Sequence, residues 1–147
     1  MKMTVEDRDA WTRALRSGYH RQGRSALCSE CCGEVEFCSL GLLEDVLGTP
    51  HRHLPRSPYR SYGKNGDTST IHLTQKTRER LSAEPEGFSV PAEGIPESCQ
   101  KDRPNLEVSV SLSRINDLGA TFLEIADLVE KYIEIVPEYS TVTGESA

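Results

Sequence analysis

The sequence predicts an α+β fold: a compact single domain with about four helices, a β-hairpin and one further strand. Three observations lead to this prediction. Apolar residues recur at helical spacing in several segments, an Asn-Gly pair separates two β-favouring segments, and a later segment alternates apolar with polar residues. The length of 147 residues suits one domain, predicted to cover 1–139 and to be followed by a flexible tail at 140–147.

Two helices are predicted in the first third of the chain. The first begins after Thr4, whose hydroxyl can cap it, and its apolar stripe includes Val5 and Trp11. Gly18 is a natural stop for this helix. The second is predicted over 37–47, where large apolar residues recur on one side.

Two further helices follow the same reasoning. Thr74 can cap a short helix that runs to residue 81. Thr121 and Glu124 form a capping-box pattern ahead of apolar residues at helical spacing, which predicts a helix over 122–133.

The remaining segments are predicted from turn residues and alternation. Asn65-Gly66 predicts a hairpin with strands near 59–63 and 68–73. The proline-rich segment before it is expected to be a loop or an irregular edge. Residues 82–105 contain four prolines and are expected to form a long loop, whereas the alternation over 106–112 predicts a strand.

The net charge of −6 is unevenly distributed. Residues 1–80 hold 13 Lys and Arg against 10 Asp and Glu, a net +3, whereas residues 81–147 hold 4 against 13, a net −9. The first half is therefore where an anionic ligand would be tolerated. Alternatively, the two halves attract each other within the fold or across a homo-oligomer.

Apolar runs are short throughout the sequence. No run approaches the length of a membrane span, and the N-terminal residues lack the apolar segment of a secretion signal. We therefore expect a cytoplasmic protein that makes no use of a membrane.

Four of the five cysteines lie close together in the sequence, and their spacing suggests a zinc site. The short pair spacing is that of a zinc knuckle, and His51 or His53 would complete a tetrahedron. The alternative is that the thiols are buried or incidental. The candidate zinc ligands are Cys28, Cys31, Cys32 and Cys38. No other cofactor is expected.

Basic and polar residues in the first half suggest an anion site. Guanidinium groups bind phosphates and carboxylates bidentately, and tyrosine rings offer a surface on which a base can stack. The alternative is a solvated face beside a turn chosen for its geometry. The candidate ligand-binding residues are Arg16, Arg21, Arg24, Tyr59, Tyr62, Lys64, Asn65 and Thr68.

Two function classes receive little support. Residues 111–131 have the outline of a helix-turn-helix, but the second helix is acidic, and phosphates would repel it. DNA is therefore not expected as a partner. No nucleophile–base order, paired metal carboxylates or phosphate loop is present, so the chain is not expected to be an enzyme.

Several separated blocks resemble a group of small phage and prophage proteins of undefined role. The blocks are LRSGY (15–19), QGR (22–24), FCSLGLL (37–43), IND (115–117), Gly119 and FLEIAD (122–127). Ser39 stands where the group has a second cysteine, and the CSECC block (28–32) is an addition. The resemblance implies a phage-type setting in the cytoplasm of a bacterial host.

Three functions remain open at this point. The leading hypothesis is a non-catalytic binding protein that sequesters a small anionic ligand, such as a nucleotide immune signal, as counter-defence. The alternative is a protein–protein module that inhibits or adapts a host factor. The third is an enzyme that degrades a nucleotide. Both binding hypotheses predict a homo-oligomer.

Overall fold

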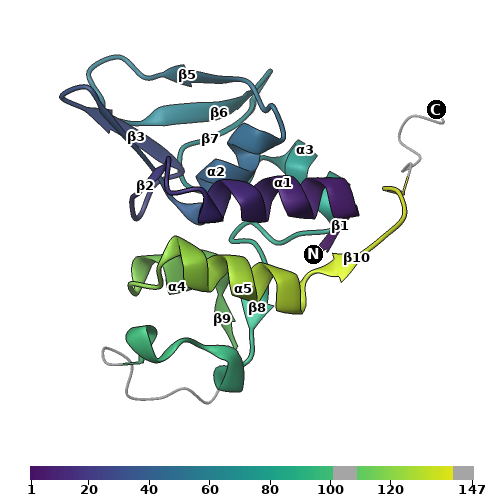
Figure 1. Ribbon diagram of the computed structural model, residues 1–147. Helices are drawn as coiled ribbons and strands as arrows, with labels where there is room; N and C mark the ends of the chain where they lie inside the picture. Colours follow the sequence, from purple (N-terminus) through teal and green to yellow (C-terminus); the bar gives the residue numbers. More distant parts are fainter. Residues whose placement is uncertain (101–108, 141–147) are drawn as a thin grey trace.

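Helix α1 (Val5–Arg16) lies at the centre of the molecule, between two groups of elements (Figure 1). Small sheets lie above it in this view, and helices α4 (Leu112–Asp117) and α5 (Phe122–Tyr132) lie below it. This is a computed structural model, and it describes residues 1–100 and 109–140. The mixture of helices and small sheets in one body confirms the predicted α+β class.

All four predicted helices are present. In α1, α3 (Gln75–Leu81) and α5, a threonine side chain accepts a hydrogen bond from a first-turn N–H, as the sequence indicated. Helix α2 (Ser39–Val46) begins two residues later than expected. Phe37 ends a strand, and the Cys38 thiol caps the helix by accepting from the Gly41 N–H.

The strands are short and form small separate sheets. Strands β2 (Arg21–Gln22), β4 (Glu34–Phe37) and β3 (Cys28–Cys31) form one sheet in that order. A second sheet contains β5 (His51–His53), β6 (Arg60–Lys64) and β7 (Asp67–Ser69). Two-stranded pairs join β8 (Ser89–Val90) to β9 (Val110–Ser111), and β1 (Lys2–Met3) to β10 (Glu134–Ile135).

The predicted hairpin is confirmed as β6–β7. Lys64 pairs with Asp67 across the turn, and both turn residues have positive φ, 55° at Asn65 and 87° at Gly66. Gly63 is also required, because a Cβ at this position would lie 1.9 Å from the carbonyl oxygen of Asp67. The backbone at Gly63 thus lies against the Asp67 carbonyl, where no side chain fits.

The expectation of a long loop at 82–105 is wrong over its described part. Residues 82–100 contain β8 and two 3₁₀ turns, η1 (Ala92–Gly94) and η2 (Glu97–Cys99). The segment is ordered because it contributes apolar side chains to the core: Phe88, Val90, Ile95 and Cys99. Residues 101–105 lie outside the described residues.

Of the strand predicted at 106–112, residues 109–112 are described in the structure. They contain β9 at Val110–Ser111, and Leu112 begins α4. Residues 106–108 and most of the predicted tail, 141–147, lie outside the described residues. At residue 139, before the tail, the Tyr139 hydroxyl contacts the Asp7 carboxylate on α1.

The core is built where α1, α2 and α5 pack together. Trp11 is fully buried, and its indole N–H donates to the Ser39 carbonyl at 3.0 Å. Gly41 allows α2 to lie against the backbone at Leu27, because a Cβ there would lie 1.7 Å from the Leu27 carbonyl oxygen. Val5, expected on the apolar stripe, is 45% exposed. None of the described helices is both long and apolar enough to cross a membrane.

Candidate anion-binding pocket

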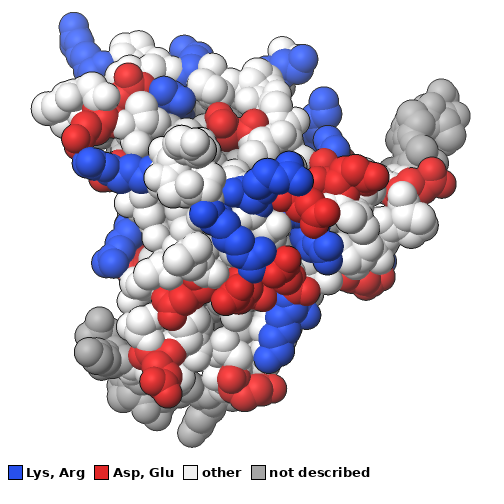
Figure 2. Space-filling model, in the orientation of Figure 1, with Lys and Arg blue, Asp and Glu red and all other residues white. Residues whose placement is uncertain are grey.

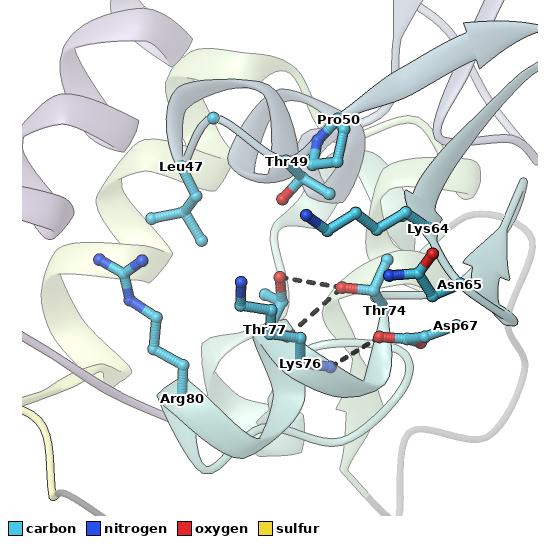
Figure 3. A pocket seen from close by; sticks show the side chains of 12 residues that line it. Leu47, Thr49, Pro50, Lys64, Asn65, Asp67, Thr74, Lys76, Thr77 and Arg80 are labelled. Carbon is cyan, nitrogen blue, oxygen red and sulfur yellow. Dashed lines mark hydrogen bonds between the residues drawn. The ribbon is translucent and has the colours of Figure 1, made fainter. Parts of the chain in front are cut away.

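A pocket of about 320 Å³ lies where three segments meet. Its walls are the loop after α2, the turn of the β6–β7 hairpin, and α3 (Figure 3). These segments are distant in sequence, so the pocket is a product of tertiary packing. Its volume lies at the lower end of the range, roughly 300–1,000 Å³, that is usual for small-molecule sites.

Three cationic side chains point toward the space inside this pocket (Figure 3). Lys64 comes from the end of β6, and Lys76 and Arg80 lie four residues apart on one face of α3. Within the described ranges, Lys64 and Lys76 have no carboxylate within ion-pair distance. The two ammonium groups are therefore available to an anion.

Arg80 differs because it already has partners. Its guanidinium donates to the Asp7 carboxylate at 2.7 Å and lies 4.8 Å from the centre of the Tyr139 ring. Arg80 thus stands between the pocket and the C-terminal segment. An anion in the pocket would compete with Asp7 for the same guanidinium group.

A buried carboxylate holds the pocket walls together. Glu44 of α2 is fully buried, and its Oε1 accepts hydrogen bonds from the hydroxyls of Thr49 and Thr77, each at 2.6 Å. Its Oε2 accepts from the backbone N–H of Thr74 at 2.7 Å. Because a buried carboxylate requires partners, these bonds tie α2, the following loop and α3 to one another.

A second carboxylate joins the hairpin to α3. Asp67 accepts hydrogen bonds from the backbone N–H groups of Gln75 at 2.7 Å and Lys76 at 3.0 Å. This carboxylate is therefore engaged at the start of the helix (Figure 3). Together with the Glu44 bonds, it fixes the position of Lys76 relative to Lys64.

The residues that line the pocket recognise charge and hydrogen-bonding groups. None of the described lining residues is aromatic, histidine or cysteine, and the one lining carboxylate is Asp67. The arrangement therefore offers three cations, whereas the hydroxyl protons of the three lining threonines are already donated within the chain. No histidine or cysteine among the described lining residues can act as a base or nucleophile. It can hold a small anion by charge-assisted hydrogen bonds.

The structure brings only two of the eight predicted ligand-binding residues into this pocket. Lys64 and Asn65 line it. Thr68 lies exposed on β7, and Tyr59 is 43% exposed, but neither lines the pocket. Tyr62 is fully buried with its ring 5.0 Å from that of His51, so the expectation that a base stacks on it is corrected.

The three predicted arginines lie elsewhere. Arg16 pairs with Asp127 at 2.8 Å and Glu130 at 2.5 Å on α5. Basic and acidic side chains meet along the line where α1 faces α5 (Figure 2). In this contact, a cation of the first half of the chain pairs with two carboxylates of the second half.

Arg21 and Arg24 also contact other parts of the chain. Arg21 pairs with Glu34 across the first sheet. The Arg24 guanidinium lies beside Gly119, 3.5 Å from the position of a Cβ there. None of the three arginines lines the pocket.

Residues from separate parts of the chain meet in a network of hydrogen bonds that we call the polar clamp, formed by Gln22, Gly23, Ser39, Asn116 and Ala120. The fully buried Asn116 amide accepts from Gln22 at 3.0 Å and from the Ser39 N–H at 3.2 Å. It donates to the Gly23 carbonyl at 2.9 Å, and Gln22 donates to the Ala120 carbonyl at 2.7 Å. The clamp joins the N-terminal segment to the turn between α4 and α5.

The four candidate zinc ligands do not form one cluster. Across the described residues, no three side chains of His, Cys, Asp or Glu are placed to hold a metal ion. Cys28 and Cys38 are buried, and burial raises the pKa of both thiols, that of Cys38 to about 11. Cys31 and Cys32 are exposed at a hairpin tip.

The sequence interpretation missed the lining residues Thr49, Lys76 and Arg80. It also missed Glu44, which lies behind the lining and bonds to Thr49. Lys76 and Arg80 carried one detectable signal, their spacing of four on a predicted helix. Nothing in the sequence indicated that this helix face lies against the hairpin turn. Glu44 carried no signal, because an acidic residue in a short helix is ordinarily exposed.

Comparison with known proteins gives one match. A protein-family model described as "Domain of unknown function (DUF8296)" matches residues 1–133. No curated protein and no solved structure matches the chain.

Proposed function

The chain belongs to this family of unknown function, and we propose that it is a non-catalytic protein that binds and sequesters a small anionic ligand in the pocket between α2, the β6–β7 hairpin and α3. A nucleotide signal of bacterial immunity is the ligand class that we propose. The biological setting is phage counter-defence, which is supported by the resemblance of the sequence blocks to small phage proteins.

The observation that carries the proposal is the pair Lys64 and Lys76. Both ammonium groups point into one pocket of about 320 Å³, and neither is neutralised by a described carboxylate. An unpaired cation on a protein surface is common, but two that converge on one concavity are suited to phosphate oxygens. A phosphate-bearing ligand is therefore favoured over a neutral one.

The lining residues favour binding over catalysis. Asp67 accepts two backbone hydrogen bonds and is not oriented as a general base toward the pocket. Histidine and cysteine are absent among the described lining residues. A ligand held here would consequently be released unchanged, which is the behaviour of a sequestering protein.

Isothermal titration calorimetry tests the proposal directly. The ligands are inorganic pyrophosphate, ADP-ribose and a set of cyclic dinucleotides. We expect one of these to bind the wild type and each of Lys64→Ala and Lys76→Ala to weaken binding at least about tenfold, because each variant removes a charge-assisted hydrogen bond. Arg52→Ala is the matched control, since Arg52 is an exposed cation on β5 outside the pocket.

Three results would contradict the proposal. The first is no heat of binding for any ligand of the set. The second is equal weakening by Arg52→Ala. The third is chemical change: the complex is heated and the released ligand is analysed by mass spectrometry, where a cleaved ligand would indicate an enzyme.

A further inference from the structure

Two neighbouring thiols lie at the tip of the β3–β4 hairpin and are not among the residues that line the pocket. Cys31 and Cys32 are both exposed, and their Sγ atoms are 3.4 Å apart. The other three cysteines are buried. Among the described residues, Cys31 and Cys32 are therefore the two thiols that a reagent in solution can reach together.

The turn that carries Cys32 resembles the Asn65-Gly66 turn in geometry but not in sequence. Cys32 and Gly33 have φ values of 57° and 81°, and Cys31 pairs with Glu34 across them. Asn65 and Gly66 have φ values of 55° and 87° between the paired Lys64 and Asp67. Asn, Asp or Gly is the usual first residue of such a turn, and cysteine gains nothing there from backbone preference.

A disulfide between these two residues is disfavoured by the backbone. Adjacent Cα atoms across a trans peptide lie about 3.8 Å apart, whereas disulfides usually span Cα distances of about 4.4–6.8 Å. The peptide bond between Cys31 and Cys32 is trans. Binding of both sulfurs to one external atom avoids this strain, because the two Sγ atoms need not move into bonding contact.

The spacing of the sulfurs suits a centre with a narrow bond angle. Two bonds of about 2.3 Å, the usual zinc–thiolate length, would meet at about 95° for sulfurs 3.4 Å apart. Zinc prefers about 109° and four ligands, and no third ligand from the described chain is within reach. A trivalent centre with a lone pair forms three bonds in a pyramid, with bond angles below the 109° of zinc. Its third bond can go to a substituent that it already carries, so it needs no third ligand from the protein.

We propose that Cys31 and Cys32 form a two-sulfur chelating site for a soft, thiophilic trivalent centre of the arsenical class. With phenylarsine oxide as the probe, two As–S bonds form and the As=O bond breaks. The oxygen leaves as water with the two thiol protons. Arsenic remains trivalent, so the reaction needs no oxidant or reductant.

Intact-mass spectrometry of the reduced full chain tests the site. We expect one phenylarsine adduct that persists in excess monothiol and is removed by dithiothreitol. A monothiol offers one sulfur to the arsenic, whereas dithiothreitol offers two and so competes with the protein as a chelator. Cys31→Ser and Cys32→Ser should each bind the probe roughly a hundredfold more weakly, since each retains one sulfur. Cys99→Ser, which removes a buried thiol, should bind like the wild type.

Any of three results would overturn the site. They are an adduct that survives in both single variants, no adduct on the wild type in the presence of monothiol, and a Cys31–Cys32 disulfide in protein purified under reducing conditions. Both variants change exposed residues at a hairpin tip, so their folding is checked simply by circular dichroism against the wild type.

Discussion

The side-chain amides of Gln22 and Asn116 are hydrogen-bonded at 3.0 Å although 94 residues separate them in the chain. Asn116 is fully buried and makes further bonds to the backbone at Gly23 and Ser39. These residues belong to the sequence blocks QGR (22–24), FCSLGLL (37–43) and IND (115–117). The blocks therefore contribute to folding by holding distant segments together, while the candidate pocket lies elsewhere.

Replacing Asn116 with alanine should destabilise the protein strongly. The change removes the polar clamp's central amide and leaves the Gly23 carbonyl and the Ser39 N–H buried without it. We expect the free energy of unfolding to fall by about 2–4 kcal/mol, measured by urea titration. Gln22→Ala serves as a comparison and should lower the free energy of unfolding by less. A loss below about 1 kcal/mol for Asn116→Ala would contradict the structural role of the clamp.

The contact between α1 and α5 should make stability depend on acid pH. The hydrogen bond from Arg16 holds the pKa of Glu130 below its ordinary value. The pair therefore stabilises the fold above the unfolded pKa of about 4.3, and this stabilisation is lost as pH falls through the lowered folded value. Carbon-detected NMR titration should show the pKa of Glu130 rising in Arg16→Gln.

Arg13→Gln is the matched control for that titration. Arg13 is an exposed arginine of the same helix, and it makes no described ion pair. The pKa of Glu130 should stay low in this variant. An equal rise of this pKa in both variants would mean that the overall charge, and not the contact with Arg16, lowers the pKa of Glu130.

Two glycines of one hairpin should respond differently to alanine. Gly66 has φ +87° with nothing within 4 Å of an added Cβ, so Gly66→Ala should cost about 1 kcal/mol of backbone strain. Gly63 has φ +105°, and its Cβ would meet the Asp67 carbonyl oxygen at 1.9 Å. Gly63→Ala should cost about 3 kcal/mol or more in thermal unfolding, and equal costs would contradict the close approach of Gly63 to the Asp67 carbonyl.

Glu44 should be required for both stability and the pocket. Glu44→Ala leaves two threonine hydroxyls and the Thr74 N–H without their acceptor, so we expect a loss of about 2–4 kcal/mol in urea unfolding. Glu44→Gln retains one carbonyl oxygen, and a threonine hydroxyl can rotate to accept from the amide. This variant should lose less free energy of unfolding than Glu44→Ala. Anion affinity should likewise fall less in Glu44→Gln than in Glu44→Ala.

Removing the partner of Arg80 should strengthen anion binding. Asp7→Asn keeps a hydrogen-bonding group beside Tyr139 but removes the charge that pairs with Arg80. The guanidinium is then free for a ligand in the pocket, and calorimetry with pyrophosphate should show about fivefold tighter binding, which corresponds to about 1 kcal/mol. Asp9→Asn is the control, because Asp9 pairs with Arg8; tighter binding in both variants would point to net charge alone.

The local elements were predictable to different degrees. Capping threonines and the Asn-Gly turn are local signals, and the structure confirms the helices and the hairpin that they predicted. The β3–β4 hairpin went unpredicted, because Cys32 occupies a turn position where cysteine is not expected. The ordered segment 82–100 was hidden by its prolines, although Phe88 and Ile95 are buried.

The sequence by itself determined the α+β class, the positions of four helices and the charge difference between the two halves. Only the tertiary structure decided where the charges act. Arg16 is neutralised by α5, whereas Lys64 and Lys76, twelve positions apart, converge on one pocket. The physical reason is that caps and turns depend on neighbouring residues, but whether a cation is paired or available depends on which segments pack beside it.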